Sequence, residues 1–133
     1  MASNDSVEKG GSVDSSDVVS ASILAAARRA LSERPDFRHG NVKLENEFYE
    51  LGLFTPAERF AAVDIALDQI RPEDRCGPDP PGNISFPPYG RRPLYAFKWY
   101  SDEYGSMMYL KFCLTGTTGL ELLVLYSFHK DLP

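Results

Sequence analysis

The chain has few of the residue types that most often build metal and nucleophilic sites. It contains two cysteines, Cys76 and Cys113, and two histidines, His39 and His129, among 133 residues. These four residues are far apart in the sequence and form no pair with the spacing of a structural zinc site. We therefore expect no metal and no other cofactor and, in a reducing cytosol, no disulfide bond between the two cysteines.

Long hydrophobic runs are missing as well. No apolar stretch approaches the roughly 18 residues that a membrane-spanning helix needs. The first residues lack the basic and then apolar order of a signal peptide. Motifs typical of phosphate-binding loops, dinucleotide-binding folds, zinc proteases and serine hydrolases are also absent. The sequence therefore predicts a cytoplasmic protein with no membrane partner.

An excess of positive charge, the usual mark of a general nucleic-acid-binding protein, is not present either. The net charge is −5, which argues against a generic nucleic-acid binder. The charge is uneven, because residues 91–133 carry five basic and four acidic side chains. A small basic site is therefore best placed in the last third of the chain.

Length and composition fit one domain behind a polar tail. Residues 1–16 are rich in Ser, Gly, Asp and Val and contain no aromatic residue, so they cannot bury enough apolar surface to offset the entropy of ordering. We predict a disordered acidic tail over residues 1–16 and a single α+β domain over residues 17–133, whose length suits one modest core.

The spacing of apolar residues predicts three helices, at 17–33, 42–51 and 56–71. The third has the clearest start signal, because Thr55 precedes Pro56 and Glu58 follows three residues after Thr55. This arrangement is a capping box with proline in the first helical position. Residues 38–41 are expected to form a turn between the first two helices.

A proline-rich segment, residues 72–93, holds seven of the ten prolines. Proline excludes this segment from a helix interior or a central strand, so we expect a long loop that includes Cys76. The loop carries Arg75, Arg91 and Arg92, which are candidates for binding the phosphates of a substrate. A stiff loop that only covers the sheet is the alternative.

The last third of the chain predicts an antiparallel β-meander with strands at 94–100, 107–114 and 120–130. We expect the N-terminal helices to pack on this C-terminal sheet. Side chains on a strand alternate between its two faces, so Tyr109 and Lys111 share one face of the second strand. Ser127 and His129 likewise share one face of the third strand.

Which faces coincide depends on the loop between the last two strands, because a slip of one residue moves every side chain to the other face. A five-residue loop places Tyr109, Lys111, Ser127 and His129 together. Its core face would then contain Leu110, Phe112, Leu122, Val124, Tyr126 and Phe128. A four-residue loop turns His129 toward the core instead, and both lengths are common in hairpins. We favour the five-residue loop because it keeps Lys111 and His129 out of the core.

Together these side chains have a definite chemical capacity. Tyrosine, lysine and histidine on one sheet surface can donate protons, accept protons and stabilise charge at a phosphodiester. The alternative is that they are simply the solvated side of the sheet.

Several short motifs, in this order along the chain, resemble those of the motility quorum-sensing regulator (MqsR) toxins, part of the RelE-like superfamily of messenger-RNA interferases. They are Glu50 to Leu53, an amphipathic helix, Glu73-Asp74, a proline-containing loop, Tyr109-Leu110-Lys111, and Ser127-Phe128-His129-Lys130. The resemblance covers roughly residues 42–133. It implies a small α+β protein that cleaves messenger RNA, free or ribosome-bound, without a metal. It also implies a cognate antitoxin protein as partner.

The resemblance also suggests individual roles. Tyr109 matches the functional tyrosine of the family, and His129 stands where the family has a basic residue. Lys98 lies close to the position of a family glutamine. A family lysine falls at about Gly77 here, with only Arg75 near it. These departures concern the catalytic residues more than the fold.

The sequence is therefore consistent with two functions. The first is the toxin of a type II toxin–antitoxin system, an endoribonuclease in which His129 acts as general acid or base and Tyr109 positions the phosphate or shares the proton transfer. In this hypothesis Lys111, Lys98 and Arg75 stabilise the developing charge. Histidine suits such a role near neutral pH. The second is a non-catalytic binding, immunity or regulatory module on a similar scaffold, which the acidic balance favours.

Overall fold

The computed structural model of the protein describes residues 15–132 apart from 35, 79–80, 86–88 and 118. The first helix begins at Ser15, so the last two residues of the expected tail are helical. The rest of the expected disordered tail, residues 1–14, lies outside the described residues.

The described residues form an α+β arrangement in which helices precede most of the strands. The helical elements are α1 (Ser15–Glu33), α2 (Lys43–Glu50), α3 (Pro56–Gln69) and the short 3₁₀ turn η1 (Pro72–Asp74). The strands are β2 (Arg38–His39), β3 (Arg75–Cys76), β4 (Tyr95–Ser101), β5 (Ser106–Thr115) and β6 (Leu122–Lys130). They form one mixed sheet in the order β2-β6-β5-β4-β3.

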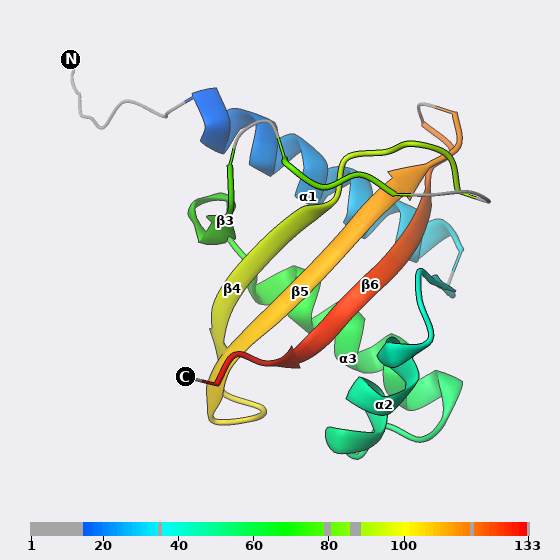
Figure 1. Cartoon of the computed structure of the whole chain (residues 1–133), viewed down its shortest axis with the longest axis vertical. Coiled ribbons are helices and arrows are strands. Elements are labelled where there is room, and N and C mark those ends of the chain that lie inside the picture. The colour runs from blue at the N-terminus through cyan, green and yellow to red at the C-terminus, as the bar shows by residue number, and fades with distance from the viewer. Residues whose placement is uncertain (1–14, 35, 79–80, 86–88, 118, 133) are drawn as a thin grey trace.

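One face of the sheet carries the helices and the main core. Figure 1 shows α1 and α3 behind the sheet, α2 beside β6, and the near face of the three long strands without a helix over it. The buried side chains between the layers include Leu24, Phe48, Leu67, Leu110 and Phe112. The expected packing of the N-terminal helices on the sheet is thus confirmed, and Leu110 and Phe112 lie on the covered face. The other face has no helix over its three long strands (Figure 1).

The two shortest strands correct the expected topology. Residues 38–41 were expected to be a turn, but Arg38 and His39 pair in parallel with β6 as β2. Cys76 was expected in a loop, but it pairs with Ala96 at the sheet edge as part of β3. Strands of two residues have no alternation to recognise, and their extended conformation is stabilised by the neighbouring strand. The expected three-stranded meander is therefore the centre of a five-stranded sheet.

An irregularity in β6 changes the expected faces. Lys111 pairs with Ser127 but Phe112 pairs with Leu125, so Tyr126 is an extra residue on β6, a β-bulge. Between the bulge and the chain end the expected faces are confirmed, because Tyr109, Lys111, Ser127 and His129 lie together. The expected five-residue loop was wrong, since six residues separate β5 from β6, and the strands pair in another register with Tyr109 opposite His129. Before the bulge the faces are reversed relative to expectation.

The reversal explains which apolar residues enter the main core. Leu123 and Leu125 are buried there, whereas Val124 and Tyr126 pack with Cys113 in a second cluster on the opposite face. The predicted core residues Leu110, Phe112 and Phe128 are confirmed. The prediction that Leu122, Val124 and Tyr126 share their face was wrong, because a bulge cannot be read from hydrophobic alternation alone.

Close packing holds the bulge in place. A Cβ atom added at Gly40 would lie 2.6 Å from carbon atoms of the Tyr126 ring, so the ring rests directly on the glycine backbone. Asn41 Nδ2 donates a hydrogen bond to the carbonyl oxygen of Tyr126 at 3.2 Å. The backbone N–H of Gly40 donates to the carbonyl of Leu125 at 2.7 Å. The chain just after β2 thereby fixes the shape of β6.

The predicted capping box at the start of α3 is confirmed. Thr55 Oγ1 accepts a hydrogen bond from the backbone N–H of Glu58 at 3.1 Å. Glu58 Oε1 accepts in return from the N–H groups of Thr55 at 3.0 Å and Phe54 at 2.8 Å. These hydrogen bonds, led by that from Phe54, lower the pKa of Glu58 from its ordinary value of 4.5. The ionised carboxylate is thus the form that stabilises the helix start.

The capping box should make stability depend on pH. A carboxyl group whose pKa is lowered on folding contributes stability above its unfolded pKa, and this contribution is lost as the pH falls through the folded pKa. We expect Glu58→Gln to be less stable than wild type at pH 7 and the difference to shrink below pH 4.5. Urea unfolding at pH 7 and pH 3 measures this change. Thr55→Ala should cost about 1 kcal/mol at pH 7. A difference between wild type and Glu58→Gln that does not change with pH would contradict the assignment.

Candidate functional site

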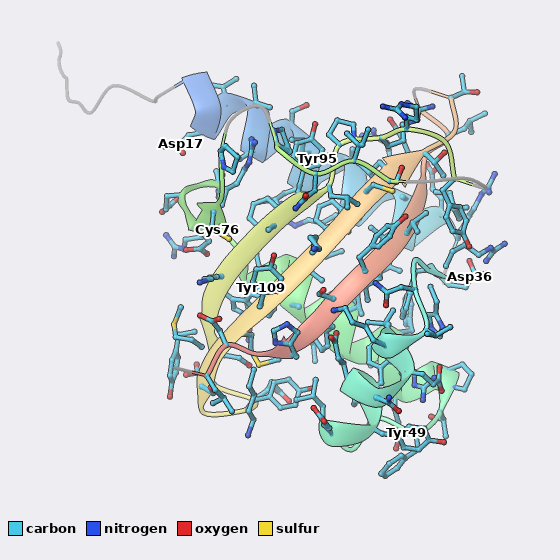
Figure 2. All side chains as sticks on the ribbon, viewed as in Figure 1. Asp17, Asp36, Tyr49, Cys76, Tyr95 and Tyr109 are labelled. Carbon is cyan, nitrogen blue, oxygen red and sulfur yellow. The ribbon has the colours of Figure 1, made fainter. Side chains whose placement is uncertain are left out.

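Three side chains predicted to act together form a row across the face of the sheet opposite α1 and α3. Lys98 of β4 pairs with Tyr109 of β5, and Tyr109 pairs with His129 of β6. The rings of Tyr109 and His129 stack with centroids 5.2 Å apart and an interplanar angle of 28°. Tyr109 lies near the middle of the sheet in Figure 2. The row therefore brings an amine, a phenol and an imidazole within reach of one small ligand.

His129 has one ring nitrogen oriented by the backbone. Its Nδ1 lies 2.8 Å from the carbonyl oxygen of Lys130. A carbonyl oxygen only accepts hydrogen bonds, so this contact favours the form in which Nδ1 carries the hydrogen. The lone pair of the neutral ring is then on Nε2, so Nε2 is the nitrogen that takes up a proton.

The environment of Tyr109 keeps its phenol protonated. Burial is the largest cause that raises the pKa of Tyr109 above its ordinary value of 10.0, and the neighbouring Cys76 and Asp131 raise it further. A phenol with a raised pKa is a hydrogen-bond donor at neutral pH rather than a base. Asp131 also lies 3.3 Å from the Nζ atom of Lys98, measured to its Oδ2. The row is thus positively charged at one end, with a carboxylate beside it.

Lys111 lies on the same face, two residues along β5 from Tyr109, and pairs with Ser127. Tyr109 and Lys111 both line a hollow of about 110 Å³ whose other wall includes Cys76 and Asn83. Lys111 also lines a second hollow, beside Asn41 and Tyr126. The two hollows share Lys111, so the lysine borders both.

Two further groups on this face were not among the predicted site residues. Lys43 of α2 donates a hydrogen bond from Nζ to Ser127 Oγ at 3.2 Å and forms an ion pair with Glu47 at 2.9 Å. Cys76 lies at the sheet edge, where burial is the main cause that raises the pKa of its thiol. Its position is shown in Figure 2. The thiol is therefore neutral and not an activated nucleophile. No sequence motif pointed to either residue, because their positions depend on the docking of α2 and β3.

Of the three candidate arginines, only Arg75 borders the hollow that Tyr109 and Lys111 line. Arg75 pairs with Phe97, whose side chain faces the helices, and its guanidinium lies over the ring of Tyr95 at 5.1 Å. Arg92 donates a hydrogen bond from Nη2 to the carbonyl of Gly116 at 3.2 Å. Gly116 follows β5 by one residue, so a strand rise of about 3.3 Å per residue places it roughly 20 Å from Tyr109. Arg91 is exposed beside Arg92.

Thus the predicted catalytic set of Lys98, Tyr109, Lys111 and His129 shares one face. Arg75 borders the hollow beside Tyr109, and Arg92 is placed elsewhere. Among the described residues, no cluster of histidine, cysteine and carboxylate side chains has the arrangement to hold a metal ion. Within the same residues, no helix combines the length and the apolar character needed to cross a membrane. Comparisons with protein-family models, with curated proteins and with solved structures found no match to the chain.

Proposed function

We propose that the protein is a metal-independent endoribonuclease that cleaves messenger RNA and acts as the toxin of a type II toxin–antitoxin pair. The observation that carries the proposal is the row of Lys98, Tyr109 and His129 on the sheet face that no helix covers (Figure 1). The resemblance of the surrounding motifs to MqsR toxins supports the same assignment. A cognate antitoxin protein is then the expected partner.

The row supplies the groups that RNA transesterification needs. The 2′-oxygen of a ribose forms a bond to the adjacent phosphorus and gives its proton to Nε2 of His129. The bond from phosphorus to the 5′-oxygen breaks, and the 5′-oxygen takes a proton from water at the open face. The products are a 2′,3′-cyclic phosphate and a free 5′-hydroxyl. In water alone the 2′-hydroxyl must give its proton to solvent, and a positioned histidine accelerates this transfer.

The other side chains act on the phosphate. The neutral phenol of Tyr109 donates a hydrogen bond to a non-bridging oxygen, a role that its raised pKa favours. Lys98 and Lys111 provide positive charge where negative charge develops in the transition state. Arg75 is given no role in this scheme, because its guanidinium lies over the ring of Tyr95.

Purified protein tests the proposal directly. We expect it to cleave RNA in the presence of EDTA, to leave 2′,3′-cyclic phosphate ends, and to leave DNA of the same sequence intact because DNA has no 2′-hydroxyl. Gel analysis with end-group chemistry measures these products. Induced expression should also arrest growth. A wild-type protein that is inactive on RNA, both free and bound to ribosomes, would overturn the proposal.

The second candidate is a binding module without catalysis. Two observations favour it, the net charge of −5 and the ion pair of Lys98 with Asp131, which places a carboxylate beside the row. Such a protein would bind its partner without changing it. Tight binding to a partner protein, combined with absence of RNA cleavage, would select this candidate.

A further inference from the structure

The sheet face that bears the row continues toward the turn between β4 and β5 with two exposed apolar side chains. Tyr100 pairs directly with Met107 across β4 and β5. Tyr100 is 60% exposed and Met107 is 42% exposed. Because side chains alternate along a strand, both lie on the same face as Lys98 and Tyr109.

This pair adjoins the row. Tyr100 is two residues from Lys98 and Met107 is two residues from Tyr109, so neighbouring positions along each strand are about 7 Å apart. The backbone N–H of Asp131 donates a hydrogen bond to the carbonyl of Met107 at 2.8 Å. The chain that follows β6 therefore stays beside β5 as far as Met107. The aromatic ring, the thioether and the charged row therefore form one continuous surface.

An isolated exposed apolar side chain is ordinary on a protein surface. Here two of them face each other across strands, next to groups suited to a phosphate. Proteins hold single-stranded RNA by combining basic groups along the backbone with aromatic side chains on which bases stack. Lys98 and Tyr100 are about 7 Å apart along β4. This spacing suits a phosphate bound at the row and a flanking base stacked on the ring of Tyr100.

We propose that Tyr100 and Met107 form a nucleobase subsite that stacks a base flanking the scissile phosphate of single-stranded RNA. The inference rests on the proposed ribonuclease function and adds its substrate class. A base inside a duplex is stacked between its neighbours and is not available to Tyr100. The protein should therefore prefer single-stranded over double-stranded RNA.

The experiment uses the full chain and a short single-stranded RNA that the wild type cleaves, with the reactive ribose 2′-O-methylated to prevent cleavage. Binding is measured by fluorescence anisotropy. We expect Tyr100→Thr, which keeps a strand-forming residue, to weaken binding roughly 5- to 150-fold, the range for the loss of one stacked base. Tyr100→Phe retains the ring and should bind like wild type. Tyr49→Ala removes an exposed tyrosine of α2 and serves as control.

A second set of oligonucleotides locates the base. Removing single bases on either side of the cleavage point should weaken wild-type binding at one flanking position, and the same removal should have little further effect on Tyr100→Thr. Met107→Ala should show a smaller loss in the same direction.

The outcomes separate the two proposals. If the wild type cleaves RNA but Tyr100→Thr binds as tightly, or if the loss is equal at every abasic position, the subsite is overturned and the ribonuclease stands. If the wild type cleaves no RNA, the proposed function and the subsite both fall. Self-association of wild type that Tyr100→Thr abolishes, with RNA binding unchanged, would instead show that the patch contacts a second copy of the chain.

Discussion

Replacing His129 by alanine is expected to reduce the rate of RNA cleavage by about 10²- to 10⁴-fold, the usual contribution of one general acid or base. The side chain is half-buried at the edge of the sheet face and stacks on Tyr109. Its removal should leave the fold intact, because surface substitutions of this kind change stability little. Single-turnover cleavage and thermal unfolding of the same preparation measure the two effects separately.

The other histidine provides the matched control. His39 lies on β2, where its Nδ1 is 3.6 Å from Glu45 Oε1, and it has no place in the row. His39→Ala should cleave RNA at the wild-type rate. Wild-type activity in His129→Ala would remove this histidine from the mechanism, and equal losses in both variants would point to a general effect of the substitution.

Replacing Phe128 by alanine is expected to lower the free energy of unfolding by about 3–5 kcal/mol. The side chain is completely buried and its ring lies 5.9 Å from that of Phe48 and 6.2 Å from that of Trp99, between ring centroids. Alanine leaves a cavity between β6 and the helices that these rings cannot fill without moving. A loss of this size is a large part of the total stability of a small domain, about 5–15 kcal/mol.

Urea unfolding of Phe128→Ala and of Phe54→Ala checks this expectation. Phe54 is 58% exposed and contacts Tyr49, so its replacement removes little buried surface. We expect a cost below about 1 kcal/mol for Phe54→Ala, in line with surface substitutions. Similar losses in the two variants would show that Phe128 is not the centre of the packing between β6 and the helices.

Local signals in the sequence predicted the long elements well. Thr55 and Glu58 marked the start of α3, and apolar alternation marked the three long strands. They also placed Tyr109 and His129 on one face of the sheet, because alternation along β5 and β6 decides the face, but the direct pairing of the two residues was not predicted. The pairing of Lys98 with Tyr109 was not predicted, because it depends on the register between β4 and β5.

The features that sequence reasoning missed depend on tertiary contacts. The bulge at Tyr126 is held by Gly40 and Asn41, residues far away in the chain. The guanidinium of Arg75 lies over Tyr95 because β3 pairs with β4 in a register that no local pattern specifies. The hydrogen bond from Lys43 of α2 to Ser127 of β6 was not predicted either, because it depends on how α2 docks against β6.

The place of β6 in the sheet has a consequence for folding kinetics. β6 lies between β5 and β2, and the contact of Asn41 with Tyr126 spans 85 residues of sequence. Closing so large a loop costs entropy before any contact repays it. The segment from β2 through α2 can dock only after β6 has formed, so we expect this segment to dock late in folding. We expect folding on the millisecond to second scale of domains rich in non-local pairing, slower than a helical bundle of this length.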